Sequence, residues 1–198
     1  MEAAKKVFFS RGYLKATMDE IALEAEISKP TIYQYFKTKD DLYFSLMLPV
    51  VEDIGIQMEK VEKKLVDGKY GSGAHLIKDF IGASYHSYKT APDVFRIVQL
   101  FQQTGLVWEL NEKTRSALNE RGGYNFQVGR RIMETAIKQG LIKKVRIYEL
   151  VDVIWGLFVG IVQLEDIKSR GKQANKHLKS TLKLAETMIV DAITIGER

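Results

Sequence analysis

The sequence predicts an all-α protein of about nine helices, in which a three-helix N-terminal element is followed by a longer helical domain. Only three of the 198 residues are proline, which favours long uninterrupted helices. Apolar residues recur at helical spacing along the chain, and no strand-like alternation replaces that pattern. The chain is long enough for one or two domains with a sizeable core.

The composition argues against several functional classes. The chain has no cysteine, and His75, His86 and His177 are far apart, so we expect no disulfide and no metal site. We find no nucleophile–base pair and no glycine-rich phosphate loop, so we expect neither an enzyme nor a cofactor. The longest apolar run, Val151–Leu164, is too short for a membrane span and contains Asp152. No basic and apolar leader precedes the first helix, and we therefore expect a cytoplasmic protein.

The charge distribution points to a local basic patch rather than to a uniformly basic protein. The net charge is +5 and the pI is about 9.2, which weakly favours a polyanionic partner. Basic and acidic residues balance through residue 45, yet the stretch from Ile27 to Lys39 contains Lys29, Lys37 and Lys39 and no acid. This patch is the more informative signal.

The segment Thr17–Leu42 reads as two short helices joined by a tight turn. A first helix over Glu2–Arg11 should stop at Gly12. Thr17 and Glu20 form a capping-box pattern, which predicts that the second helix starts at Met18. Residues 25–28 form the turn, and Ser28 can cap a third helix that has Pro30 in its first turn.

The third helix should run to about Phe36 and present a polar face to DNA. Ile32 and Phe36 are expected to point inward, and the outward residues are Lys29, Thr31, Tyr33 and Gln34. Lysine suits the guanine edge and glutamine suits the adenine edge, so we expect Lys29 and Gln34 to read bases. The hydroxyls of Thr31, Tyr33 and Tyr35 suit phosphates. The alternative is that Tyr35 belongs to the core and that the lysines are a solvated face.

Beyond this element the sequence predicts further helices and two domains. Asp67–Gly73 is expected to be a loop, and Pro49 should kink or break the helix before it. The predicted helices cover 39–66, 74–90, 93–103, 109–139 with a possible break at Gly122 and Gly123, 147–169 and 172–195. We expect residues 1–45 to form the DNA-binding domain and residues 46–198 a helical ligand-binding and dimerisation domain.

The last two helices are predicted to form the interface of a homodimer. The helix over 147–169 is apolar nearly all round, so one side can face its own subunit and the other a second subunit. Two such helices per subunit would make a four-helix interface around a two-fold axis. The predicted interface residues are Trp155, Gly156, Val159, Gly160, Leu178, Leu182, Ala185 and Ile189.

The family resemblance described in the next paragraph implies an effector pocket, and polar and aromatic residues of the helical domain are the candidates to line it. An apolar pocket with a few polar groups is the usual form of such a site. The candidates are Tyr85, Tyr88, Gln99, Gln103, Trp108, Tyr124, Gln127 and Trp155. They favour a hydrophobic or aromatic molecule with few charges. The alternative is that these aromatic residues are ordinary core.

Three motifs at fixed mutual spacing resemble the DNA-binding domain of TetR-family (tetracycline-repressor-like) transcriptional regulators. They are A-T-x-D-E-I-A at 16–22, T-I-Y-Q-Y-F at 31–36 and K-T-K-D-D-L at 37–42. The resemblance implies a homodimer that binds a palindromic operator on double-stranded DNA, usually as a repressor controlled by a small-molecule effector. By position it implies phosphate contacts for Thr17 and Lys39. It also implies that the recognition helix is lined by Ser28, Lys29, Thr31, Tyr33 and Tyr35.

The sequence departs from the family pattern in two places. The family usually has glycine in the turn where this chain has Glu26, and a left-handed conformation there would cost about 1–2 kcal/mol. The family also usually has more helix and a basic arm before Ala3, so we expect either fewer N-terminal phosphate contacts or a start farther upstream.

Other functions remain open at this level. An activator of the same fold, an α-helical enzyme, and a helical interaction protein with a degenerate DNA-binding element are the alternatives. For signalling we expect a shift of the helix that begins at Lys39, which would change the separation of the two recognition helices in the dimer.

Overall fold

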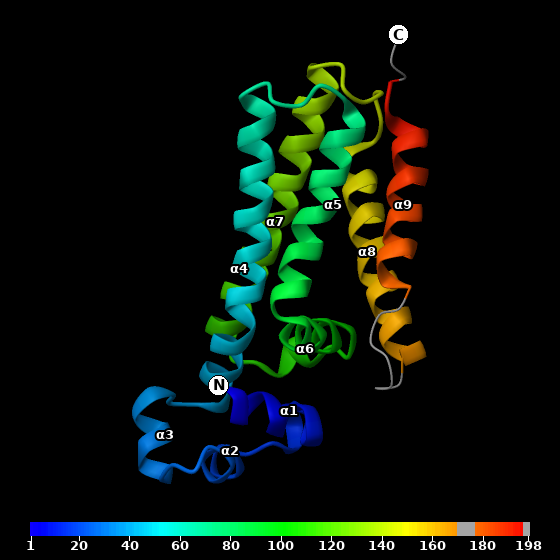
Figure 1. Cartoon of the computed structure of the whole chain (residues 1–198). Coiled ribbons are helices and arrows are strands. Elements are labelled where there is room, and N and C mark those ends of the chain that lie inside the picture. Colours follow the sequence, from blue (N-terminus) through cyan, green and yellow to red (C-terminus); the bar gives the residue numbers. More distant parts are fainter. Residues whose placement is uncertain (170–176, 196–198) are drawn as a thin grey trace. The chain divides into compact units, whose positions relative to one another are not determined.

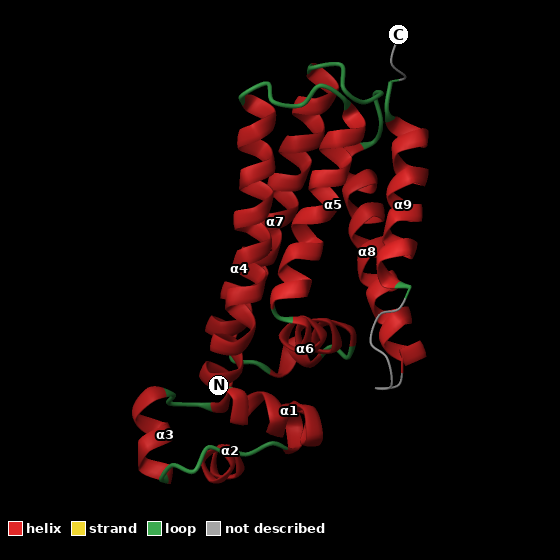
Figure 2. Ribbon diagram, viewed as in Figure 1, coloured by secondary structure: helices red, strands yellow, loops and turns green. Residues whose placement is uncertain are grey.

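The computed structural model describes residues 1–169 and 177–195, except for the side chains of Gln103 and Ser169. In this part of the chain every long element is a helix, which confirms the predicted all-α class (Figure 2). The helices are α1 (Glu2–Lys15), α2 (Met18–Glu24), α3 (Lys29–Tyr35), α4 (Lys39–Val66), α5 (Gly73–Thr90), α6 (Pro92–Gln103), the 3₁₀-helix η1 (Leu106–Glu109), α7 (Glu112–Lys138), α8 (Ile147–Ser169) and α9 (Leu178–Ile193).

Most predicted helix bounds agree with the structure, and the differences have local causes. Gly12 has a φ of 71° and interrupts the helical backbone of α1, which nevertheless resumes to Lys15. Pro49 lies inside α4 without ending it, and Gly122 and Gly123 lie inside an unbroken α7. α7 begins later than predicted because residues 106–109 form η1. The predicted start of the last helix at 172 lies outside the described residues.

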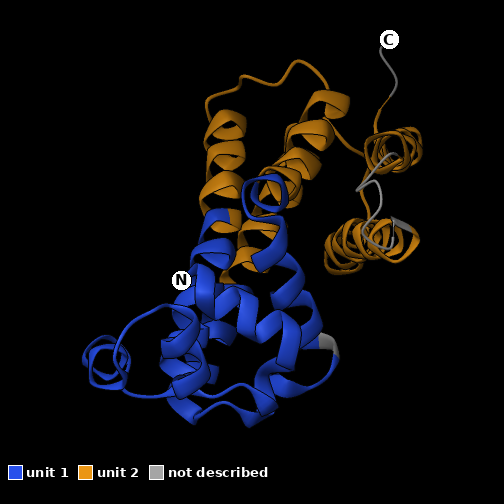
Figure 3. Ribbon diagram, turned by 60° about the horizontal axis from the view of Figure 1, so that its bottom comes forward, with its two compact units in different colours: residues 1–53, 87–123 blue, residues 54–86, 124–198 orange. Residues whose placement is uncertain are grey.

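The chain divides into two compact units, which Figure 3 shows in different colours. The first unit comprises residues 1–53 and 87–123, so α6, η1 and the start of α7 join the N-terminal helices. Four rings from α1, α4 and α6 form an aromatic cluster at its core, with centroid distances of 4.6 Å for Phe8–Tyr43, 4.8 Å for Tyr43–Phe101 and 5.6 Å for Tyr13–Phe101. The division into domains of residues 1–45 and 46–198 stays a prediction.

The second unit comprises residues 54–86 and 124–198. α7 contacts both α5 and α8, since a Cβ on Gly129 would lie 3.3 Å both from Phe80 and from Val151. Arg131 of α7 donates two hydrogen bonds to Glu62 of α4, at 2.7 and 2.8 Å. α8 packs against α9 (Figure 1).

Two connections meet at one end of this second unit. The backbone of Gly73 lies against the carbonyl of Leu141, because a Cβ on Gly73 would come within 2.2 Å of that oxygen. The α7–α8 connection also pairs with the end of α9, where the Lys143 amide donates to the Ile193 carbonyl at 2.7 Å. Glycine is therefore required at position 73 for the loops to approach.

One described helix, α8, is long and apolar enough to cross a membrane by length and composition. Residues Ile147–Lys168 contain a window with a mean hydropathy of 1.7. No membrane span was expected from the sequence because only the run Val151–Leu164 was considered, which is shorter than this segment. The core helix of a soluble protein can pass the same test, and α8 packs against α9 in this structure.

Candidate DNA-binding interface

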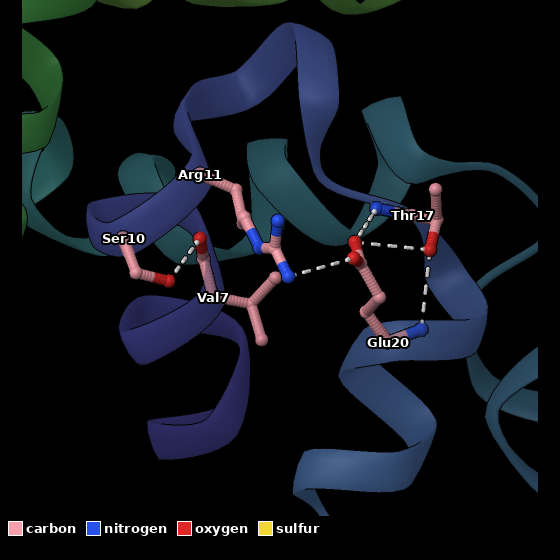
Figure 4. A network of polar contacts seen from close by, with 5 residues as sticks. All are labelled: Val7, Ser10, Arg11, Thr17 and Glu20. Carbon is pink, nitrogen blue, oxygen red and sulfur yellow. Dashed lines mark hydrogen bonds and ion pairs between the residues drawn. The ribbon is translucent and has the colours of Figure 1, made fainter.

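The start of α2 is fixed by the predicted capping box (Figure 4). Thr17 Oγ1 accepts a hydrogen bond from the Glu20 amide at 3.2 Å, and Glu20 Oε2 accepts one from the Thr17 amide at 3.1 Å. Arg11 of α1 approaches the same carboxylate at 3.6 Å. The hydroxyl of Thr17, predicted to contact a phosphate, is therefore already engaged in helix capping, although its side chain is exposed.

The turn between α2 and α3 contains a residue in the left-handed region. Glu26 has a φ of 55° and is the one non-glycine residue with positive φ in the described chain. Its amide bonds to the Leu23 carbonyl at 3.1 Å, and the Ile27 amide bonds to the Ala22 carbonyl at 3.0 Å. This pair of bonds defines a Schellman motif with Glu26 at the position that glycine usually occupies. The conformation considered from the sequence is the observed one.

α3 turns one apolar side inward and leaves its polar face open. Ser28 caps the helix by accepting from the Thr31 amide at 3.3 Å, and Pro30 sits in the first turn. Ile32 is buried, as predicted, and the residues predicted to point outward are exposed or half-buried. Tyr35 is 76% exposed, which excludes the alternative that it is core. Lys29, Pro30, Tyr33, Gln34 and Tyr35 are thus all accessible on one short helix.

Lys29 forms an ion pair in this structure. Its ammonium donates to Asp19 of α2 at 2.7 Å, and that hydrogen bond raises the pKa of Lys29. Both side chains are more than half exposed, so water competes with the pair. The ion pair is therefore weak, and Lys29 can leave Asp19 at small cost.

Lys39 lies at the start of α4, as predicted, and makes contacts within the protein. Its ammonium donates to the carbonyls of Tyr13, Leu14 and Ala16 at 2.8, 3.4 and 3.1 Å, and it lies 4.5 Å from the centre of the Tyr13 ring. An ammonium has three donors, and all three are used at the end of α1. In this arrangement Lys39 caps α1, and its contact with the DNA backbone stays a prediction.

The neighbouring residue Asp40 joins three elements of the first unit. It accepts a hydrogen bond from the Tyr13 hydroxyl of α1, and the amide and side-chain nitrogens of Asn111 both donate to it at 2.8 Å. Asn111 in turn accepts from the Thr114 amide at 3.0 Å and so caps α7. Partial burial disfavours the carboxylate, but the bonds from Tyr13 and Asn111 outweigh it and lower the pKa of Asp40. Burial and the Asp40 bond raise the pKa of Tyr13.

The predicted effector residues are dispersed. Tyr88 and Gln99 are buried in the first unit, where Tyr88 packs edge-on against Phe95 with centroids 5.5 Å apart. Tyr85 and Trp155 are half-buried in the second unit. Trp108 is 70% exposed, and Tyr124 and Gln127 are exposed, so these three do not line an enclosed pocket. The side chain of Gln103 lies outside the described part.

The predicted dimer residues fall on both sides of α8 and α9. Leu178, Leu182 and Ile189 are buried within the subunit, so they pack inside it and are unavailable to a second copy. Trp155, Val159 and Ala185 are half-buried, and Gly156 and Gly160 are exposed. The outward apolar side chains are instead Val153, Leu157, Leu164, Ile167, Leu184 and Met188.

Arg130 of α7 makes ring contacts that the sequence analysis did not predict. Its guanidinium lies 4.1 Å from the centre of the Tyr148 ring and 5.9 Å from that of Phe126. Its Nε is buried without a hydrogen-bond partner. Helical spacing gave no signal for this stack, because Tyr148 belongs to α8.

Two short helices, each with a capped N-terminus, are joined by a tight turn, and the second has an exposed polar face. This arrangement is that of helix-turn-helix DNA-binding proteins. Comparison with known proteins agrees with this class. Residues 1–46 match the family model described as bacterial regulatory proteins, tetR family. The chain is 46% identical over 52 residues to the HTH-type transcriptional activator FasR of Mycolicibacterium smegmatis. It is 42% identical over 52 residues to the HTH-type transcriptional regulator HbdR of Aromatoleum. These matches span 26% of this chain and 24% and 23% of the two relatives.

Solved structures match over nearly the whole chain. PfmR, a TetR family regulator of Thermus thermophilus, has a TM-score of 0.77 at 15% identity, with 96% of each chain covered. FadR of Bacillus subtilis in complex with stearoyl-CoA has a TM-score of 0.65 at 22% identity, covering 92% of this chain and 94% of that one. AibR in complex with isovaleryl coenzyme A and operator DNA has a TM-score of 0.71 at 18% identity, covering 94% of each. Residues 1–46 therefore resemble the DNA-binding domain of tetR-family regulators, and the chain as a whole has the fold of these solved structures.

Proposed function

We propose that the protein is a dimeric transcriptional regulator that reads a palindromic DNA operator through α3 and responds to a small hydrophobic effector. The exposed face of α3 carries the proposal, because Lys29, Gln34 and two tyrosines are accessible while Ile32 anchors the helix. A helix presented in this way fits the major groove. A protein that acts on chromosomal DNA in a bacterium works in the cytoplasm.

The residues of α3 have different roles in this proposal. Lys29 exchanges Asp19 for a guanine edge, and Gln34 reads adenine. Tyr33 and Tyr35 place hydroxyls on the phosphates, and Thr31 and Ser28 fix the start of the helix. Lys39 acts indirectly, through the end of α1.

The dimer forms through the outward apolar faces of α8 and α9. Leu157, Leu164, Leu184 and Met188 are exposed in the single chain, and contiguous apolar surface of this kind marks an interface. Covering them with a second copy also accounts for the apolar character of α8 without a membrane. The two copies then present two α3 helices to two half-sites.

The effector is proposed to bind in the helical domain with Gln99 as a polar contact. Gln99 is only 6% exposed and lies on α6, which also carries the buried side chains of Phe95 and Phe101. A buried amide is costly unless it is paired, and a ligand can supply the pairing. Two of the similar structures hold acyl-coenzyme A molecules, which makes acyl thioesters the first class to test.

The direction of regulation is proposed to be repression with release by the effector. The one specific observation in favour of activation is the name of the 46%-identical relative FasR, a transcriptional activator. A promoter-reporter assay with and without the gene for this protein separates the two directions.

The DNA proposal is tested by selecting genomic fragments on the full-length protein and sequencing them. We expect an enriched inverted repeat. Gln34→Ala should weaken binding by about 1–3 kcal/mol and relax one base position in each half-site. Gln127→Ala is the matched control, since Gln127 is equally exposed on α7. If no fragment is enriched, the helical interaction protein becomes the better description.

The effector proposal needs a separate assay. Acyl-coenzyme A molecules of increasing chain length are titrated into the protein–operator complex, with the free fatty acids as controls. Release of DNA should require the effector and should weaken in Gln99→Leu, whose operator affinity without effector should remain unchanged. Loss of operator binding in Gln99→Leu itself would show that the residue is structural.

A further inference from the structure

The positive charge of this chain is concentrated outside its DNA-binding unit. The first unit carries 12 Lys and Arg against 13 Asp and Glu, whereas the second carries 18 against 12. Residues 138–146 alone contain four basic residues and no acid. The excess of positive charge therefore belongs to the unit that does not contain α3.

This charge gathers at the end of the second unit where two connections meet. The α4–α5 connection bears Lys69, and the α7–α8 connection bears Lys143 and Lys144. The contact of Gly73 with the Leu141 carbonyl brings these connections together at one end of the unit (Figure 1).

An open depression of about 310 Å³ lies beside the α4–α5 connection. Its lining comes from the end of α4, the α4–α5 connection and the first turns of α5: Lys64, Lys69, Tyr70, His75, Lys78 and Asp79. Three lysines against one aspartate give the lining a formal charge of +2, with histidine neutral. A phosphate monoester carries about −1.5 to −2 at pH 7, which matches this charge.

Asp79 organises the depression from within. Lys64 and the Tyr70 hydroxyl both donate to Asp79 Oδ2 at 2.9 Å. Partial burial disfavours the carboxylate, but these two bonds outweigh it and lower the pKa of Asp79. Lys69 pairs with Asp67 at 3.0 Å, and among the described residues Lys78 has no ion-pair partner. Lys78 is thus the cation most available to a ligand.

We infer that this depression is a second site, distinct from the proposed effector pocket, that binds the phosphate group of a small molecule. Lys78 and Lys69 supply the charge, and the His75 ring offers a further polar contact. Asp79 holds Lys64 and Tyr70 in place, and its negative charge weakens the binding of anions to the site. The inference rests on the second unit alone and does not depend on the operator or on the hydrophobic effector.

The test uses the full-length protein with inorganic phosphate and tripolyphosphate as probes, against chloride at equal ionic strength. Calorimetry should show saturable binding of one tripolyphosphate per chain. Lys78→Gln and Lys69→Gln should each weaken it about three- to tenfold, and Asp79→Asn should tighten it by a similar factor. Lys113→Gln, which removes an exposed lysine of the first unit, should leave it unchanged.

A spectroscopic reading keeps the test specific to the site. The chain has three histidines, and phosphate should shift the ring resonances of His75 while leaving His86 and His177 in place. Assignment by His75→Gln identifies the signal. Equal shifts of all three, or equal weakening by Lys113→Gln, would mean a diffuse field and would overturn the site. Displacement of tripolyphosphate by random duplex DNA at equal phosphate concentration would assign the surface to nucleic acid and overturn the small-molecule inference.

Discussion

Glu26 offers a sharp test of the turn geometry, because its backbone is left-handed and its side chain is exposed. Glu26→Gly removes the steric penalty of about 1–2 kcal/mol that a side chain pays there. Glycine also loses more conformational entropy on folding, which lowers the free energy of unfolding by about 0.4–1 kcal/mol. The net gain is about 1 kcal/mol, or a rise in melting temperature of about 2–4 °C for a chain of this size.

The measurement is thermal unfolding by circular dichroism at one fixed protein concentration, since a dimer melts in a concentration-dependent way. Glu26→Ala is the matched control, because it removes the same charge but keeps the Cβ. We expect no gain for Glu26→Ala, while both variants lose one carboxylate beside the DNA face and bind DNA slightly better at low salt. Equal stabilisation by both substitutions would refute the backbone argument and assign the effect to charge.

Four further predictions follow from named contacts. Lys39→Gln should lower the free energy of unfolding, measured in urea, by about 1–2 kcal/mol, because the cap on α1 is lost. If stability is unchanged and the salt slope of DNA binding becomes smaller by about 0.9, Lys39 contacts a phosphate instead. The pKa of Asp40 in the folded protein lies below its ordinary value of 3.8, so the Asp40 carboxylate stabilises the fold above pH 3.8 and this contribution is lost as the pH falls through the folded pKa. In acid titrations the stability difference between Asp40→Asn and the parent should therefore shrink as the pH falls from 3.8 through the folded pKa. Gly73→Ala should destabilise the second unit by about 2 kcal/mol or more in thermal melts, because the methyl group meets the Leu141 carbonyl, whereas Gly82→Ala meets open space and should be neutral or stabilising. Leu184→Glu should yield monomers in analytical ultracentrifugation, and a dimer of unchanged mass would refute the proposed interface.

Local patterns were sufficient to predict much of the fold. The capping box at Thr17 and Glu20 involves residues three apart, so its hydrogen bonds follow from the spacing itself. The bounds 147–169 of α8 follow from its apolar pattern and agree with the structure. The left-handed backbone at Glu26 was considered from the motif alone.

Contacts between distant segments could not be predicted in this way. Lys39 looked like a surface cation because its partners, the end carbonyls of α1, lie 23 to 26 residues earlier. Leu178 and Ile189 were apolar at the right spacing for a dimer stripe, but spacing does not tell which side of a helix faces its own subunit. The Arg130 stack on Tyr148 has the same origin.

The position of the recognition helix depends on the junction of α1 and α4 more than on α3 itself. α3 buries only Ile32, so its orientation is set by the neighbouring elements to which it is connected. At the junction Lys39 caps α1, and Asp40 joins Tyr13 of α1 to Asn111 at the start of α7. Phe101 of α6 packs on the same Tyr13 ring. A displacement of α6 or of the start of α7 must therefore break these contacts or move α1 with it, and removing the Asp40–Asn111 bonds should uncouple the two without touching a DNA-contacting residue.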